Sequence, residues 1–122
     1  MKYAIDAPIE SATHCHCSQC RKGHGAAFAS YGTVPLSAFR LLEGGEALGR
    51  YISSPGVTRS FCKVCGSTLL WHTEHRRHAN SVGVALGTLD SPLGEIAQKH
   101  IYTDSKADWY AINDGLPVEQ RP

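Results

Sequence analysis

The sequence predicts a mainly β, antiparallel fold within one domain that spans residues 1–122. Short runs rich in β-branched and aromatic residues recur along the chain, and Gly and Pro interrupt them at short intervals. No long helical segment alternates with these runs, as a parallel βαβ sheet would require. The length of 122 residues also lies within the usual size of a single domain.

Eight segments have the composition of strands and are bounded by Pro, Gly or polar turn residues. They are residues 2–5, 11–17, 26–31, 48–53, 57–61, 67–72, 81–85 and 99–103. The sequence SSPG at 53–56 is typical of a hairpin turn. The segment PLSAFRLLEGG, residues 35–45, is expected to form one short helix, because Pro suits a first helical turn and Gly follows a helix end.

Composition excludes several classes of partner. With 42% hydrophobic and 19% charged residues the chain resembles an ordinary soluble protein, and a net charge of +1 offers no positive field for nucleic acid. No apolar run is long enough for a membrane span, and acids stand where a secretory segment would be apolar. We therefore expect a cytoplasmic protein without nucleic-acid or membrane partners. In that reducing compartment five Cys and seven His indicate metal binding or catalysis rather than disulfides.

The first cysteine cluster has the sequence HCHCSQC, residues 14–20. On an extended segment Cys15 and Cys17 lie on the same side, and the C-x-x-C turn brings Cys20 toward them. Three thiolates can thus converge on one ion. Zinc is the expected cofactor, because it accepts tetrahedral sulfur ligands and deprotonates a coordinated thiol. Buried apolar cysteines are the alternative interpretation.

The second cluster is a C-x-x-C-G knuckle formed by Cys62, Cys65 and Gly66. Its tight turn is typical of half a metal site, with Gly66 taking a positive φ. A redox C-x-x-C motif opens a helix, whereas the residues after Gly66 have the composition of a strand.

Two metal arrangements remain open from spacing alone. One is a four-thiolate structural zinc ribbon of Cys17, Cys20, Cys62 and Cys65, although 41 residues between the two pairs exceed the usual gap of about 15 to 20. The other is a catalytic site of Cys15, Cys17 and Cys20, with a fourth position open to water or substrate.

Four segments together resemble the glutathione-dependent formaldehyde-activating (GFA) enzyme family, also called the CENP-V/GFA domain. They are HCHCSQCRKGHGAAFAS, SSPGVTRSFCKVCGSTLLWH, VGVALGTLD and HIYTDSKADWYAINDGLP. The match runs in order from about Tyr3 to Pro117. The resemblance implies an Mss4-like fold of coiled antiparallel β-sheets with zinc sites.

The resemblance also implies ligand roles. Cys15, Cys17 and Cys20 correspond to the family's catalytic zinc ligands, and Cys62 and Cys65 to half of a structural zinc site. The other half is a C-x-C-G motif close to the N-terminus, which the sequence lacks ahead of Lys2. We therefore expect Cys62 and Cys65 to be metal-free or weakly loaded, unless other ligands such as His72 and His75 complete the site.

The activity implied by the resemblance is that of a carbon–sulfur lyase. It joins a small thiol such as glutathione to formaldehyde, giving an S-hydroxymethyl adduct. The alternative function is a non-enzymatic structural zinc-ribbon binding module. Arg21 and Lys22 follow the last ligand and are candidates to offset the thiolate charge or hold a glutathione carboxylate. His14 and His16 alternate with the ligands and should point away from them, while Trp109 and Tyr110 are given no catalytic role.

Overall fold

The computed structural model describes residues 1–121, most of which lie in short β-strands and their connections. The strands are β1 (Lys2–Ile5), β2 (Ser11–Cys15), β3 (Ala29–Pro35), β4 (Phe39–Glu43), β5 (Leu48–Ser54), β6 (Val57–Cys62), β7 (Thr68–Thr73), β8 (Ser81–Ala85) and β9 (Ala97–Ile101). The α-helix is α1 (Ser18–His24), and short 3₁₀ turns are η1 (Leu36–Ala38), η2 (Gly45–Ala47), η3 (Leu86–Thr88) and η4 (Thr103–Ser105). No helix among these residues is long and apolar enough to span a membrane.

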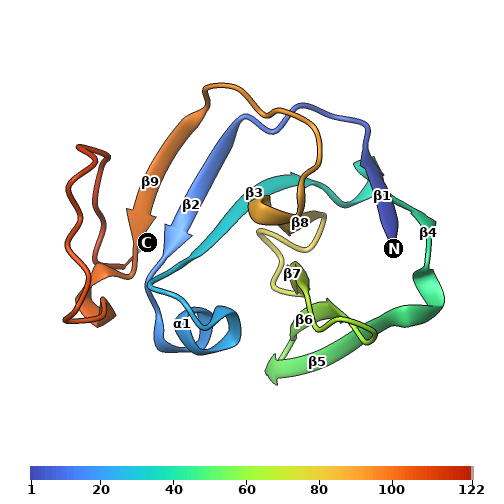
Figure 1. Cartoon of the computed structure of the whole chain (residues 1–122), viewed down its shortest axis with the longest axis horizontal. Coiled ribbons are helices and arrows are strands. Elements are labelled where there is room, and N and C mark those ends of the chain that lie inside the picture. Colours follow the sequence, from blue (N-terminus) through green and yellow to red (C-terminus); the bar gives the residue numbers. More distant parts are fainter. Residues whose placement is uncertain (122) are drawn as a thin grey trace.

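The larger sheet has the strand order β5-β6-β7-β8-β3-β2-β9, and β1 pairs with β4 in a separate ribbon. The mainly β prediction is confirmed. Within the larger sheet the pair β2–β9 is parallel and its other pairs are antiparallel. Figure 1 shows the sheet curving around α1, which lies between β2 at one end and the β5–β6 hairpin at the other.

Apolar side chains on facing strands form the core. Val34, Val82 and Val84 are fully buried, and residues of the β1–β4 ribbon, including Tyr3 and Phe39, pack against them. Gly32 allows a close approach here, because a Cβ at that position would lie 2.6 Å from Ile9 Cγ2. The two strands of the ribbon pair with each other and not with the larger sheet. Hydrophobic packing therefore attaches the ribbon to that sheet.

The predicted helix over 35–45 is wrong. The segment forms η1, β4 and η2, and β4 pairs with β1 through the register Ile5↔Phe39 and Tyr3↔Leu41. The apolar residues that resemble a helical face instead lie in a strand that pairs with a segment distant in the sequence. Local sequence does not contain that partner, and tertiary pairing overrides the helix signal.

Helix α1 has no counterpart among the sequence predictions. It begins after Cys17, whose Sγ accepts a hydrogen bond from the Cys20 amide at 3.4 Å, and it ends at Gly25 with φ 59°. The cysteine sulfur thus takes the place of the Ser, Thr, Asp or Asn oxygen that normally marks a helix start. For the same reason the strand expected over 11–17 stops at Cys15, and the one expected over 26–31 begins only at Ala29.

Candidate active site and metal centre

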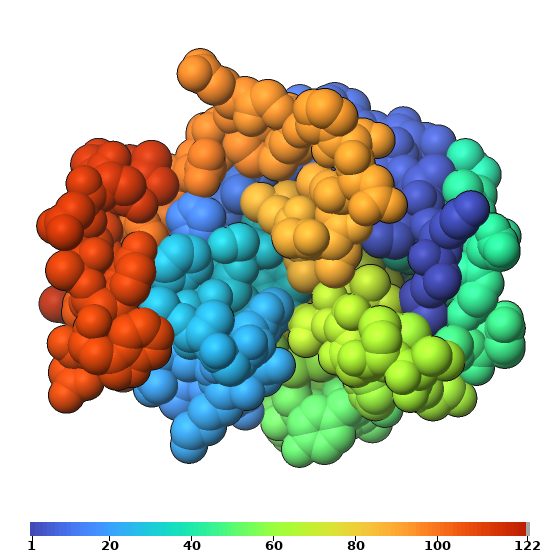
Figure 2. Space-filling model, in the orientation of Figure 1, coloured from blue at the N-terminus to red at the C-terminus, as the bar shows by residue number. Residues whose placement is uncertain are grey.

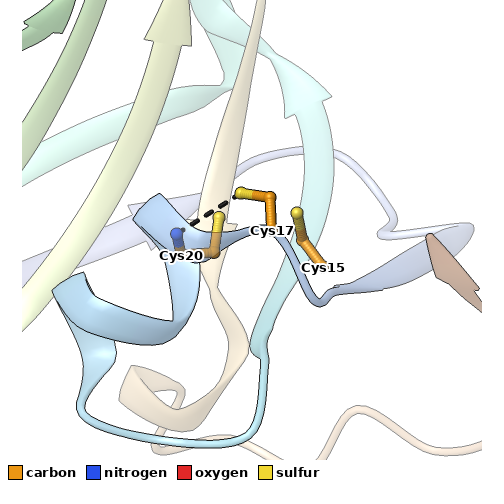
Figure 3. Close-up of side chains that lie close together, drawn as sticks. All are labelled: Cys15, Cys17 and Cys20. Carbon is orange, nitrogen blue, oxygen red and sulfur yellow. Dashed lines mark hydrogen bonds between the residues drawn. The ribbon is translucent and has the colours of Figure 1, made fainter. Parts of the chain in front are cut away.

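The sulfur atoms of Cys15, Cys17 and Cys20 lie within 4.8 Å of one another. Cys15 ends β2, Cys17 caps α1, and Cys20 lies in the first turn of that helix. Figure 3 shows the three side chains pointing toward a common centre. The structure therefore brings together the three residues that the sequence analysis singled out as one ligand set.

The arrangement fits a zinc ion. Zinc–sulfur bonds of about 2.3 Å in a tetrahedron place neighbouring sulfurs about 3.8 Å apart. Three sulfurs within 4.8 Å reach that spacing with small rotations of their side chains. Thiolates are also the soft donors that zinc retains without redox chemistry. Cys15, Cys17 and Cys20 would supply three protein ligands to such an ion.

Hydrogen bonds among the three cysteines favour the thiolate form of Cys17. Hydrogen bonds donated by Cys15 and Cys20 hold the pKa of Cys17 well below its ordinary value. The hydrogen bond to Cys17 correspondingly raises the pKa of Cys15. Cys15 and Cys20 are buried in a packed cluster with Ala29 and Tyr31, so water cannot compete freely for these bonds.

Arg59 is a site residue that sequence reasoning missed. It projects from β6, and its Nη1 donates to Cys20 Sγ at 3.6 Å. Its Nε donates to Ser53 Oγ at 3.1 Å, which fixes the side chain at a second point. No local signal marks this arginine, because 39 residues separate it from Cys20 and only the sheet register and curvature bring the two together.

Tyr31 and His24 form a neutral pair beside the cysteines. His24 Nε2 and the Tyr31 hydroxyl are 3.0 Å apart, and Tyr31 packs in the same cluster as Cys15 and Cys20. Burial raises the pKa of Tyr31 to about 12 and lowers the pKa of His24 below its ordinary value. At neutral pH both groups are therefore uncharged, and Tyr31 keeps its proton.

His24 also faces an open cavity of about 480 Å³. Its walls come from the end of α1, from β3, from the segment after the knuckle and from η3, and they include Phe28, Ser30, Ser67 and Thr88. Figure 2 shows the blue surface of α1 beside the yellow-green surface that follows β6, with the orange segment after β8 above them. Ala85 lines this cavity and belongs to the packed cysteine cluster, so cavity and cysteines are neighbours.

The two histidines on either side of Cys15, His14 and His16, are held away from the sulfurs, as alternation predicts. His16 is fully buried, and its Nε2 lies 2.7 Å from His100 Nδ1, while His100 Nε2 lies 2.8 Å from Asp114 Oδ2. Since the carboxylate can only accept, His100 donates from Nε2 and accepts at Nδ1 from His16. These hydrogen bonds connect the segment that carries the three cysteines to the C-terminal segment that carries Asp114. His14 is similarly held between Ser30 and Gln98.

The cations next to the ligands in sequence do not face the sulfurs. Arg21 Nε donates to the backbone oxygens of Ser105 at 3.1 Å and His16 at 3.4 Å. Lys22 is exposed on α1. The charge near the cysteines comes from Arg59 instead.

The knuckle presents only two sulfurs. Cys62 is buried, whereas Cys65 is exposed, and its Sγ lies 3.0 Å from Ser67 Oγ. Within residues 1–121 no third Cys, His, Asp or Glu joins them in a metal-ligand group. His72, a candidate partner, has its Nε2 2.9 Å from the carbonyl oxygen of Ala79. The ribbon arrangement, which would combine Cys17 and Cys20 with this pair, does not occur here.

Trp109 and Tyr110, the aromatic residues near the C-terminus, differ in exposure, and Tyr110 is half-buried. Trp109 is exposed. Tyr110 packs edge-on against Phe28 with ring centroids 5.5 Å apart. Neither belongs to the cysteine cluster.

The fold and the site together define a mainly β protein whose coiled sheet brings three cysteines into a group that could hold a metal ion. The sequence profile described as "Glutathione-dependent formaldehyde-activating enzyme" matches residues 1–105, and the chain belongs to this family. The family prediction is confirmed. A crystal structure of a Rhodobacter sphaeroides protein is also similar, with 26% sequence identity and a TM-score of 0.61. The match covers 79% of this chain and 89% of that one.

Proposed function

We propose that this protein is a zinc-dependent carbon–sulfur lyase that joins a small thiol of the glutathione type to formaldehyde. Family membership supports the reaction class. The observation that carries the proposal is the convergence of Cys15, Cys17 and Cys20, which leaves one corner of a tetrahedron without a protein ligand among the described residues.

Zinc held by these cysteines would supply positive charge that keeps an incoming sulfur as a thiolate at neutral pH. This matters because a free thiol has a pKa near 8.5 and is mostly protonated under those conditions. The site is less suited to activating water, because three thiolate ligands would reduce the Lewis acidity of the zinc ion. The ligand set therefore favours a thiol substrate over hydrolysis.

The reaction balances without an oxidant. The substrate sulfur forms a bond to the carbonyl carbon of formaldehyde, and the π electron pair of the C=O bond moves to oxygen. That oxygen takes up the proton that the thiol has lost, which gives the S-hydroxymethyl adduct. The chain has to orient two reactants and move one proton.

The residues around the cysteines have different roles in orienting the reactants and in moving the proton. Tyr31 remains protonated, so it can donate a hydrogen bond but cannot act as a base at neutral pH. His24 holds the Tyr31 hydroxyl and lines the neighbouring cavity. That cavity, with Ser30, Ser67 and Thr88 on its walls, is where we place the body of the thiol substrate.

The test has to separate catalysis from the spontaneous addition of thiols to formaldehyde. Exchange NMR of glutathione and formaldehyde measures the rate with and without zinc-loaded protein. We expect faster exchange with the native protein and the spontaneous rate with Cys17→Ala. Ser18→Ala, an exposed substitution next to Cys17 at the start of α1, is the matched control and should retain the acceleration.

Two results would contradict the proposal. One is a folded Cys17→Ala variant that accelerates exchange as well as the native protein. The other is a zinc-loaded native protein that leaves the spontaneous rate unchanged with glutathione, cysteine and 2-mercaptoethanol.

A further inference from the structure

Arg59 is a charged side chain attached to the cysteine cluster from a distant strand. Its guanidinium donates through Nη1 to Cys20 Sγ and through Nε to Ser53 Oγ. An arginine that is hydrogen-bonded to a ligand atom differs from a surface arginine, because its positive charge offsets the negative charge of the whole ligand set.

Several contacts fix the position of this arginine. In the sheet register Arg59 lies opposite Tyr51 on one side and Trp71 on the other, so the three side chains share one face. Trp71 packs against the buried cysteine cluster, which identifies this face as the one turned toward the ligands. Gln19 of α1 also donates to the carbonyl oxygen of Ser53 at 3.3 Å. The β5–β6 hairpin and the ligand helix are thus joined at Ser53.

The charge of the site explains what such an arginine can do. Three thiolates and one divalent zinc ion carry a net charge of minus one, and a fourth thiolate would make it minus two. Attracting a second anion to an anionic centre is unfavourable unless a cation lies nearby. Arg21, the nearest cation in sequence to the ligands, donates to backbone oxygens instead. Arg59 is the cation hydrogen-bonded to the cluster.

We propose that Arg59 is a positioning residue that fixes Cys20 and offsets one negative charge, so that the metal centre accepts the substrate as a fourth thiolate. This inference rests on the proposed function and extends it to a residue outside the ligand set. Arg59 acts here through Cys20 and the charge of the centre.

The test uses cobalt(II) in place of zinc, because its visible spectrum reports a change from three to four sulfur ligands. Native protein, Arg59→Gln and Arg59→Lys are titrated with 2-mercaptoethanol, whose only ionisable group is its thiol. We expect Arg59→Gln to weaken thiol binding by about 10- to 100-fold, the range for loss of an outer-shell partner. Arg59→Lys, which keeps the charge, should recover most of that loss.

Two further variants sharpen the result. Ser53→Ala removes the second anchor of the guanidinium and should weaken thiol binding in the same direction by a smaller factor. Arg50→Gln makes the same charge change at an exposed position on β5 and should leave thiol binding unchanged. Thermal melting of each metal-free variant verifies that the fold is retained.

Three outcomes would overturn the proposal. Thiol affinity could be unchanged in a folded Arg59→Gln variant, or Arg59→Lys could bind as weakly as Arg59→Gln, which would exclude the charge effect. A loss seen with glutathione but not with 2-mercaptoethanol would show that Arg59 binds a substrate carboxylate instead. Failure of the lyase reaction is distinguishable, because it would appear as absent formaldehyde exchange while the cobalt titrations still differ.

Discussion

The two cysteine clusters of this protein have similar spacing but different surroundings. In the first, Cys17 and Cys20 are joined by Cys15, and two of the three side chains are buried. In the second, Cys65 is exposed and hydrogen-bonded to Ser67, and no third ligand approaches within residues 1–121. A C-x-x-C motif therefore does not by itself bring three ligand atoms together.

The difference arises from what each turn is attached to. The first loop is held by α1, by Arg59 and by the chain His16–His100–Asp114, so its sulfurs are fixed in one orientation. The knuckle is a tight turn closed by the hydrogen bond from the Gly66 amide to the Cys62 carbonyl oxygen at 2.7 Å. The side chains around the first cluster thus hold three sulfurs close together, whereas the contacts of the knuckle bury Cys62 and leave Cys65 exposed.

The largest difference should appear in metal content. Cys20→Ala removes one of three convergent ligands and should lower zinc affinity by more than the about 10- to 100-fold typical of outer-shell changes. Cys65→Ala should have the same content of tightly bound zinc as the native protein, which we expect to be no more than one ion per chain. Elemental analysis after dialysis against a weak chelator measures both. Two tightly held zinc ions per native chain would contradict this assignment.

The knuckle region should depend on packing rather than metal for its stability. Leu69 is buried with Leu48 and Cys62, and Leu69→Ala should lower the free energy of unfolding by about 2 to 5 kcal/mol. Urea denaturation of the metal-free protein gives this value. Val64→Ala, at an exposed position within the knuckle, should stay within about 0.5 kcal/mol of native. A similar loss in both variants would argue against the packing explanation.

Thiol reactivity should distinguish the clusters in the metal-free protein. The hydrogen bond from Ser67 lowers the pKa of Cys65, so its thiolate forms at a lower pH than that of an ordinary cysteine. Iodoacetamide should therefore label the exposed Cys65 before the buried Cys20, as peptide mass spectrometry can show. In Ser67→Ala the pH midpoint for labelling Cys65 should move upward. An unchanged midpoint would exclude Ser67 as the cause.

The smallest effect should come from the hydrogen bond between His100 and Asp114, whose contribution to stability should weaken at acid pH. The hydrogen bond from His100 lowers the pKa of Asp114 from its ordinary 3.8. The stabilisation is thus full above that value and is lost as pH falls through the lower folded-state pKa. Asp114→Asn keeps an acceptor but not the charge, so its melting temperature should fall less steeply with acid than that of the native protein. Parallel pH curves would refute this contribution.

The parts of the site that could be predicted are those encoded locally. Cys15, Cys17 and Cys20 lie close together in the sequence, from the end of β2 to the first turn of α1, so their spacing alone indicates convergence. Arg59 and Tyr31 could not be assigned, because their proximity to the cysteines depends on strand register and on the curvature of the sheet.

The fold was predictable to a similar extent. Turn residues mark most of the strands, whereas the parallel pairing of β2 with β9 joins segments far apart in the chain and has no local signal. The segment 35–45 has the local pattern of a short helix, yet its strand β4 is stabilised by pairing with β1. α1 was missed because the sulfur of Cys17, the residue just before the helix, takes the place of the usual capping oxygen.

The parallel pairing of β2 and β9 has a consequence for how the protein matures during synthesis. His16 lies 84 residues ahead of the histidine that orients it, so the cysteine loop leaves the ribosome long before its support. At synthesis rates of about 5 to 20 residues per second, that interval lasts roughly 4 to 17 s. During this time the segment that carries the three cysteines lacks the contact between His16 and His100 that supports it in the folded protein. That contact can form only once β9, which carries His100, has been synthesised and pairs with β2.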